Sequence, residues 1–410
     1  MFNPYLLMTF LYITLAVLGA LDASFVNFQF LPMFAGLRWM RVHFITLGAM
    51  TEIAFGILPI ITAVRLKLPR PRVRWDIWLM LNLGLLVLLL GIPMINSVII
   101  TVGGLLVFAA AILLILQLSQ MHAQKRESQP PAGRRFYIVG LIYLLLGVII
   151  GTGLWQGWSA WLQIQVPIEV HIHANNWGFM SLIFAGLLVD LYPSFSGHSF
   201  QWKRSITPIF WMMTLGALGL VLGPWFKSNL FSVPGLILHL SATIWLLLNV
   251  IKPLLHDRRL WSSGIFHLVT SYVWILAPVL IAPLIILGVP GFPGAGIEQN
   301  APQALIYGWV LQFGYAIIPL LFRRIFTPEA QPRLGGSWFS LVTVHLGGVL
   351  LWSGIFLQDA QAVLHGTAYA LWFVSMLPIA YELWKIIRAS FENNASTEFE
   401  PPVLESTTGN

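Results

Sequence analysis

Cysteine is absent from this 410-residue sequence, and charged residues make up only 9% of it. Without cysteine, the chain itself cannot form a disulfide framework, hold an iron–sulfur cluster through thiolates or attach haem through a CxxCH motif. The scarcity of charge accompanies 58% hydrophobic residues and a mean hydropathy of +0.80, which is far outside the range of a soluble domain. The composition therefore predicts a membrane protein.

Apolar stretches long enough to cross a hydrocarbon core of about 30 Å recur up to about residue 386. They predict twelve transmembrane helices, at residues 5–29, 41–64, 76–95, 97–118, 136–157, 168–192, 205–223, 231–251, 263–289, 301–322, 337–358 and 362–386. We therefore expect an all-α integral membrane protein, with one helical bundle over residues 1–388 and a disordered cytoplasmic tail over residues 389–410.

Lysine and arginine are distributed unevenly between the two ends of these spans. Of the 22, 19 lie in connectors after even-numbered spans or at the C-terminal end, and only Arg38, Arg41 and Lys227 lie on the other side. By the positive-inside rule, both termini then face the cytoplasm, and we expect the protein in the cell membrane. Loop orientation accounts for the net charge of +7, so lipid is an expected partner and nucleic acid is not.

Histidine is the prominent ionisable residue inside the predicted spans. Seven of the ten histidines fall there: His43, His171, His173, His239, His267, His345 and His365. Ionisable residues inside a membrane are costly and face the protein interior or a cavity, which makes them candidates for function. Four of them lie near the outer ends of their helices and can share one layer, so we expect these four to bind a cofactor: His43, His171, His173 and His365.

The other three histidines lie deeper in the predicted membrane. His239 is about two turns below the outer layer, His345 is near the middle, and His267 is toward the inner side. A single intramembrane histidine can hold helices together by a hydrogen bond instead of binding a metal. That interpretation is favoured for His267, and both interpretations stay open for His239 and His345.

The HxH pair in "VHIHANNWG" has a geometric consequence. Residues i and i+2 of a helix are about 200° apart, so His171 and His173 point to nearly opposite sides and cannot chelate one metal together. The spacing favours a helix that forms a wall between two sites, with each histidine supplying a ligand to a different one.

Three stretches of the sequence are similar to one another: "HFITLGAM" from His43, "HANNWGFM" from His173 and "QALIYGWV" from Gln303. Each has a polar first residue and a glycine five positions later. Glu52 and Gln312 both follow nine positions after the first residue, so the second and tenth spans look like copies of one element. This pattern indicates internal duplication and makes Gln303 a lost ligand. Glu52 is a candidate proton relay, or else a buried carboxyl group paired with a neighbouring polar group.

These stretches resemble a known family. "HIHANNWGFMSLIFAGLLVDLYPSFSG" is similar to the first signature of the NnrS family of haem- and copper-containing membrane proteins, which has the form W-H-x-H-E-M-x-F-G-F. "FHLVTSYVWILAPVLIA" resembles that family's H-L-x-Y-x-W-I-P stretch, and "QALIYGWVLQFGYAIIPLLFRR" resembles its H-A-L-T-x-G-A-M helix. The matches follow the family's order. Ala174 and Asn175 replace the Glu-Met of the signature, Val170 replaces its Trp, and Gln303 replaces the His of the third motif.

The HxH is also similar to a helix of haem–copper oxidase and nitric-oxide reductase catalytic subunits, in which one histidine ligates a low-spin haem and the other a high-spin haem. By that resemblance, His43 and either His171 or His173 would hold one haem between them. The adjacent histidines that bind copper in the oxidases are missing, because the chain contains no His-His dipeptide.

The resemblances imply a redox membrane protein with one or two haem b groups that handles NO or O2 or passes electrons. Asn175 or Asn176 would fix the tautomer of a ligand histidine. Quinol or a cytochrome would donate the electrons, and respiratory-complex subunits would be partners. A copper site would have to be built from separate helices, which leaves these candidates: His239, His267 and His345.

Two other functions stay open. The first is a transporter with a histidine-lined path, which the broken-helix signals in "ILAPVLIAPLIILGVPGFPGAG" favour and the scarcity of carboxylates in the spans disfavours. The second is a non-catalytic membrane subunit of a respiratory complex that keeps only some ligand histidines. Colour separates these alternatives, because a haem protein has a Soret band and a transporter does not.

Overall fold

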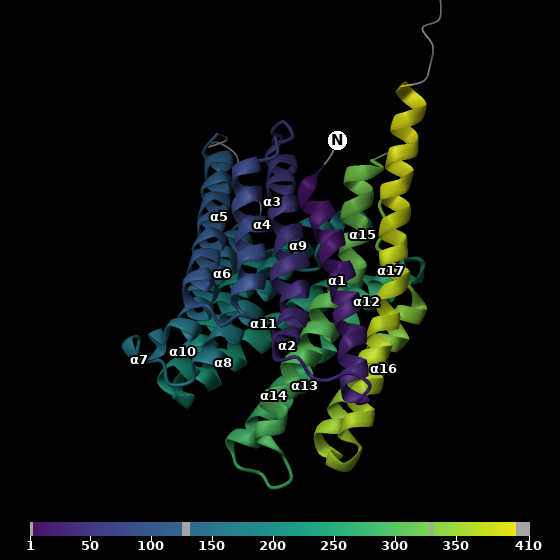
Figure 1. Ribbon diagram of the computed structural model, residues 1–410. Coiled ribbons are helices and arrows are strands. Elements are labelled where there is room, and N and C mark those ends of the chain that lie inside the picture. Colours follow the sequence, from purple (N-terminus) through teal and green to yellow (C-terminus); the bar gives the residue numbers. More distant parts are fainter. Residues whose placement is uncertain (1–2, 125–131, 329–330, 399–410) are drawn as a thin grey trace, which may run out of the picture.

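The computed structural model describes residues 3–124, 132–328 and 331–398, which form helices and contain no strand (Figure 1). Eleven helices of the described chain are long and apolar enough to cross a membrane. The predicted all-α membrane protein is therefore confirmed.

The twelve predicted spans all correspond to helices. In chain order they are α1 (Pro4–Asn27); α2 (Ala35–His43), η1 (Phe44–Met50) and α3 (Thr51–Leu66); α4 (Trp75–Gly91); α5 (Ser97–Ala123); α6 (Arg134–Gln156); α8 (Pro167–His173), η2 (Ala174–Met180) and α9 (Ser181–Ser196); η3 (Lys203–Ser205) and α10 (Ile206–Phe226); α11 (Asn229–His256); α12 (Ser263–Thr270) and α13 (Val273–Ile286); α14 (Gly294–Ala304), η5 (Leu305–Leu311) and α15 (Gln312–Phe326); α16 (Trp338–Phe356); and α17 (Gln361–Glu398). Short helices α7 (Trp158–Trp161), η4 (Arg258–Leu260) and η6 (Gln358–Ala360) lie in connectors.

Two elements differ from their predicted lengths. The third span, α4, has 17 residues, or about 25 Å at 1.5 Å per residue, and it ends at the turn before Ser97. The last helix, α17, continues to Glu398, so residues 389–398 of the tail that we predicted to be disordered are helical. Residues 399–410 lie outside the described residues.

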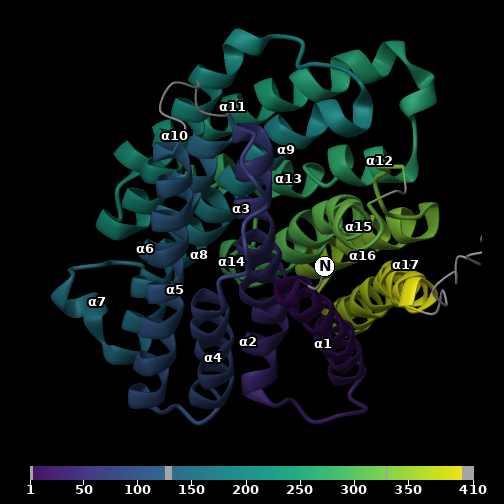
Figure 2. The same ribbon diagram turned by 90° about the horizontal axis from the view of Figure 1, so that it is seen from above.

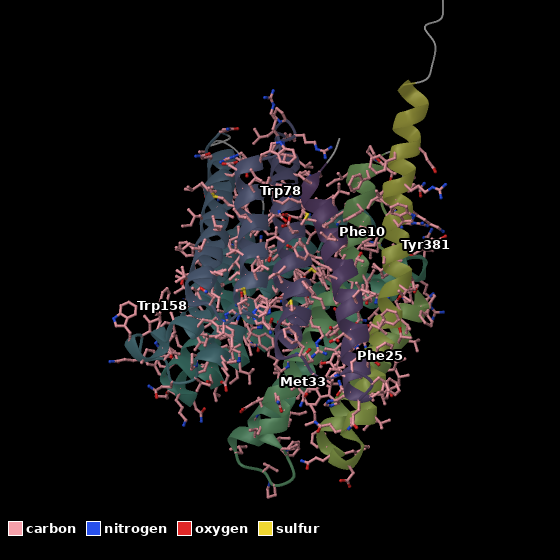
Figure 3. The ribbon with its side chains drawn as sticks, in the orientation of Figure 1. Phe10, Phe25, Met33, Trp78, Trp158 and Tyr381 are labelled. Carbon is pink, nitrogen blue, oxygen red and sulfur yellow. The ribbon has the colours of Figure 1, made fainter. Side chains whose placement is uncertain are left out.

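Successive spans run in opposite directions, so the start of α1 and the end of α17 lie at the same end of the bundle (Figure 1). Exposed apolar side chains cover its outer surface, among them Phe25 and Tyr381 in Figure 3. We call the end that carries both termini the basic end, because the connectors that follow α3, α5, α9, α11 and α15 meet there and hold most of the lysine and arginine.

Three spans form the centre of the bundle. Seen from above, α3, α9 and α15 lie inside a ring of the other helices (Figure 2). The most apolar 18-residue stretch is 78% buried in the second and sixth spans and 100% buried in the tenth, against 33–56% in the other eight long spans. These three central spans are the ones that carry the three similar stretches of sequence.

Each central span changes from an α-helix to a π-helix and back again, at η1, η2 and η5. The three π-helices occupy the similar stretches, whose first residues, His43, His173 and Gln303, are spaced 130 residues apart. π-Helical turns are rare and occur frequently at functional sites. A glycine in each lies against an aromatic ring of the preceding span: Gly48 against Tyr12, Gly178 against Tyr143 and Gly308 against Trp274.

The remaining helices repeat with the same period. The most extensive helix pairs are α4 with α5, α10 with α11 and α16 with α17, and each follows one central span. The chain therefore consists of three units of four spans, at residues 4–123, 134–256 and 263–398. The sequence indicated a duplication, whereas this order of helices recurs three times.

The close contact at Gly178 should make this position intolerant of any side chain. A Cβ atom there would lie 2.3 Å from Cγ of Tyr143, whose hydroxyl is held by a 2.8 Å hydrogen bond to the Thr214 carbonyl oxygen. We expect Gly178→Ala to lower the free energy of unfolding by about 1–3 kcal/mol, because overpacking forces neighbouring groups apart. Thermal unfolding in detergent measures the loss. Gly294→Ala is the control, since its Cβ would have its nearest neighbour at 3.4 Å; equal melting temperatures of the two variants would contradict the prediction.

Candidate functional site

Three histidines share one arrangement of hydrogen bonds. Nδ1 of His43, His171 and His173 lies 2.8, 2.9 and 2.6 Å from the main-chain carbonyl oxygens of Trp39, Gly147 and Leu220, respectively. A carbonyl oxygen only accepts, so Nδ1 carries the proton and Nε2 of the neutral ring carries the lone pair. Nε2 of these three rings has no hydrogen-bond partner within the described parts of the chain. We call them the open histidines.

His43 and His171 come together from two different units. Their ring centroids are 6.4 Å apart and their planes are 27° apart. His43 ends α2 and His171 lies in α8, so the pair joins the central spans of the first and second units. Trp39, one turn before His43, also stacks on that ring, with centroids 4.0 Å apart. The structure thus places two of the four predicted cofactor ligands beside each other.

Glycines on α6 make room for His171. A Cβ atom at Gly151 would lie 2.7 Å from Cε1 of His171, and one at Gly147 would lie 2.5 Å from the side chain of Asn175. Nδ2 of Asn175 donates to the His171 carbonyl oxygen at 2.8 Å and lies 3.4 Å from the ring Nδ1. Since the Nδ1 proton points to the nearer Gly147 carbonyl, the main chain fixes the tautomer, not the asparagine that we had proposed for this role.

His173 points away from this pair, as the HxH spacing predicts. Its ring bonds to Leu220 of α10, whereas the ring of His171 bonds to Gly147 of a different helix, α6. His173 has no second histidine ring facing it among the described residues. The helix that carries both histidines therefore separates two surroundings, one with a histidine pair and one with a single open histidine.

His365 differs from the other three predicted ligands. Its Nε2 donates to the Leu351 carbonyl oxygen of α16 at 3.2 Å, and the next residue, Gly366, accepts a 2.9 Å hydrogen bond from Ser24 of α1. His365 therefore links α17 to α16, close to the point where α17 contacts α1. The structure therefore does not bring His365 into the group of open histidines.

The three deeper histidines also use Nε2 for contacts within the protein. Nε2 of His239 lies 3.1 Å from Ser181 Oγ and 3.2 Å from the Trp177 carbonyl oxygen. Nε2 of His267 lies 3.0 Å from the Ser337 carbonyl oxygen. In His345 it lies 2.8 Å from Thr270 Oγ1 and 3.0 Å from Gln312 Nε2.

No group of three His, Asp or Glu side chains suited to a metal ion forms in the described ranges. A copper site at His239, His267 and His345 therefore stays a prediction. Each of these residues contacts polar groups of neighbouring helices, as in the helix-packing interpretation.

Glu52 lies completely buried nine residues after His43, beside Asn82 of α4. Nine residues correspond to about 13 Å along a helix, so this carboxyl group is well separated from the histidine pair. The buried hydroxyl of Tyr12 has no hydrogen-bond partner within the described chain. Both carboxylate oxygens of Glu52 are likewise buried without a hydrogen-bond partner there, so the pairing of Glu52 with a polar group and its role as a proton relay both stay predictions.

The third unit has an amide, that of Gln303, at the position where the first two units have the imidazoles of His43 and His173. Gln303 is buried, and its Oε1 accepts a 3.2 Å hydrogen bond from the hydroxyl of Tyr369. The guanidinium group of Arg41 lies 5.1 Å from the centre of the same tyrosine ring. Arg41 Nε and Nη1 are buried and have no hydrogen-bond partner among the residues described. This contact could not be predicted from the sequence, although Arg41 stands only two positions before His43.

No protein-family model matches this chain, and no curated protein matches it. The resemblance to the NnrS family and to oxidase subunits therefore stays a prediction, and the geometry of the open histidines carries the functional argument.

Proposed function

We propose that this protein is a haem-binding redox membrane protein, in which His43 and His171 would hold one haem b. The observation that carries the proposal is the histidine pair itself: two imidazoles from different units lie beside each other with ring centroids 6.4 Å apart, with Nδ1 anchored to the main chain and Nε2 open. Ligand histidines in metal sites commonly donate their other ring nitrogen to a carbonyl oxygen in this way.

The spacing of the rings fits one metal ion between them. A bond from a metal to an imidazole nitrogen is about 2 Å, so two rings that ligate one ion from opposite sides have centroids roughly 6 Å apart. The observed 6.4 Å agrees with that value. Offset packing of two aromatic rings also covers this distance, and it is the alternative that the experiment below tests.

The open histidines suit two different tasks. Haem b, when bound, supplies an iron that takes up and releases one electron. His43 and His171 together would hold a haem that transfers electrons. His173 faces no second histidine among the described residues, so it would hold a second haem alone, and that haem would be the one to bind NO or O2. Quinol or a cytochrome would supply the electrons.

A reduced-minus-oxidised visible spectrum of the purified protein, with haem quantified as the pyridine complex, tests the proposal. We expect the spectrum of a six-coordinate haem b, and we expect His43→Ala or His171→Ala to abolish it, because each variant removes one of two strong ligands. A colourless protein after expression with ample haem would contradict the proposal.

Two other histidines serve as controls. His256 is exposed, and His256→Ala should leave the spectrum unchanged. His365→Gln should also leave it unchanged, since the glutamine amide can still donate to the Leu351 carbonyl oxygen. Loss of haem from the His365 variant would show instead that His365 is a ligand, as the sequence first suggested.

One observation favours a transporter as the second candidate. The ninth span is interrupted between α12 and α13, and Thr270 at this break contacts both His345 and Gln312. Broken helices with polar groups at the break form substrate sites in many transporters. Absence of haem, together with uptake of a solute into vesicles that His345→Ala abolishes, would favour this candidate.

A further inference from the structure

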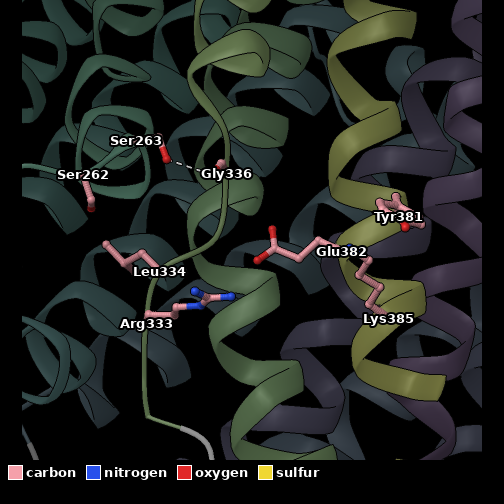
Figure 4. A pocket seen from close by; sticks show the side chains of 8 residues that line it. All are labelled: Ser262, Ser263, Arg333, Leu334, Gly336, Tyr381, Glu382 and Lys385. Atoms are coloured by element: carbon pink, nitrogen blue, oxygen red, sulfur yellow. Dashed lines mark hydrogen bonds between the residues drawn. The ribbon is translucent and has the colours of Figure 1, made fainter. Parts of the chain in front are cut away.

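A pocket of 460 Å³ opens at the basic end of the third unit (Figure 4). It lies between the start of α12, the segment before α16 and the outer part of α17. Its polar lining consists of Ser262, Ser263, Arg333, Tyr381, Glu382 and Lys385. The volume lies in the range of roughly 300–1,000 Å³ that is usual for ligand sites in proteins.

The walls of this pocket are fixed by hydrogen bonds between elements. Ser263 Oγ donates to the Gly336 carbonyl oxygen at 2.8 Å, and Arg323 Nη1 donates to the Arg333 carbonyl oxygen at 3.0 Å. Gly336 has a φ of 94°, which favours glycine, and a Cβ atom there would lie 2.3 Å from the ring of His267. The segment that carries Arg333 is thus held against α12 on one side and α15 on the other.

The charges that face the pocket do not balance. Glu382 forms an ion pair with Arg323, whose side chain is 6% exposed, so these two neutralise each other. Arg333 and Lys385 have no acidic partner among the described residues. Lys385 Nζ instead lies 4.3 Å from the centre of the Tyr381 ring. Two positive charges therefore remain, on opposite sides of one cavity.

The surroundings of the pocket are those of a membrane interface. Tyr381 is 60% exposed and Trp384 is 50% exposed on the outer face of α17, and Trp338 begins α16 directly after the pocket segment. Exposed aromatic residues near clustered basic residues are typical of the boundary between apolar chains and lipid headgroups.

From this arrangement we propose that the pocket binds a phosphate group, chiefly the phosphodiester of an anionic lipid, between Arg333 and Lys385. Arginine and lysine donate charge-assisted hydrogen bonds to phosphate oxygens, and the serine hydroxyls of the lining add neutral donors. The inference does not depend on haem binding, because it uses no residue of the histidine site.

Binding to the purified full-length protein in an uncharged detergent tests this inference. The probes are dioctanoylphosphatidylglycerol, dioctanoylphosphatidylcholine and inorganic phosphate, and the measurements are the shift in melting temperature and the dissociation constant from tryptophan fluorescence. We expect phosphatidylglycerol to stabilise the protein. Arg333→Gln and Lys385→Gln should each weaken its binding by about tenfold or more, which is the usual effect of losing a hydrogen bond to a charged group.

Arg388→Gln is the matched control. Arg388 lies one turn beyond Lys385 on α17, but it is paired with Glu392 at 2.7 Å and lies outside the pocket. If inorganic phosphate alone reproduces the effect with the same dependence on Arg333 and Lys385, the phosphate group comes from a soluble compound. Equal stabilisation by phosphatidylcholine would overturn the proposal, as would tight binding by the Arg333→Gln/Lys385→Gln protein or an equal loss in the Arg388 variant.

Discussion

The His173→Ala variant is expected to lose one of the two haem b groups proposed above and to keep the other, whose spectrum should be unchanged. The reason is that the two neighbouring rings have different surroundings. His171 is anchored to Gly147 of α6 and lies beside His43, whereas His173 is anchored to Leu220 of α10. Removing the His173 ring should therefore leave the histidine pair intact.

Haem quantification and the visible spectrum measure this result together. The wild-type protein should contain two haems per chain and the variant one, which is a twofold decrease. His171→Ala should give the reverse spectrum, with the six-coordinate species lost. Loss of both haems in the His173 variant would contradict the separation of two sites by α8. A single haem in the wild-type protein, with the same haem content in the His173 variant, would contradict the proposed second haem site and leave the proposed site at His43 and His171 standing.

The second large effect is expected at the buried ion pair between α15 and α17. Glu382→Ala leaves Arg323 without its counterion, and the Arg323 side chain is only 6% exposed. An uncompensated charge in such surroundings costs about 3–5 kcal/mol of stability. The hydrogen bond from Arg323 to the Arg333 carbonyl oxygen remains, but it does not replace the lost negative charge.

Glu392→Ala is the matched control, because it breaks an ion pair on the same helix in which both side chains are more than 60% exposed. That change should cost no more than about 1 kcal/mol. Denaturation of both variants in the same detergent gives the comparison. Arg323→Met combined with Glu382→Leu should recover much of the loss, since an apolar pair of similar size removes the unpaired charge. Equal stability of Glu382→Ala and Glu392→Ala would contradict the prediction.

The spans could be predicted because hydrophobicity and length are local properties of the sequence. The opposite directions of His171 and His173 could also be predicted, since they follow from the period of a helix. The similarity of the stretches that begin at His43, His173 and Gln303 was visible, but their π-helical form was not. Each π-helix has a glycine that lies against an aromatic ring on another span, as Gly178 lies against Tyr143. The π-helices could not be predicted because a single sequence does not show which spans are in contact.

The grouping of the histidines was predicted in part. His43 and His171 meet as one of the resemblances implied, yet His365 is bonded to α16, and the expected copper ligands contact separate partners. The histidines differ in which ring nitrogen is bonded within the protein. The partner of that nitrogen is often a main-chain carbonyl group. Because every residue has such a group, the sequence does not show which residue will be the partner. A π-helical turn also holds more residues than an α-helical one, which rotates every later side chain relative to the face that simple periodicity predicts.

The complete burial of the tenth span bears on how the chain is made. Ribosomes deliver the chain from its N-terminus, so Gly294–Phe326 is synthesised before α16 and α17, which cover part of it in the finished bundle. During that interval the amide of Gln303 lacks the Tyr369 hydroxyl, and the amide of Gln312 lacks His345 and has only Thr270 of α12 as a partner. Assembly of the third unit is thus a late event of biosynthesis, and a chain that stops after α15 exposes the most deeply buried surface of the molecule.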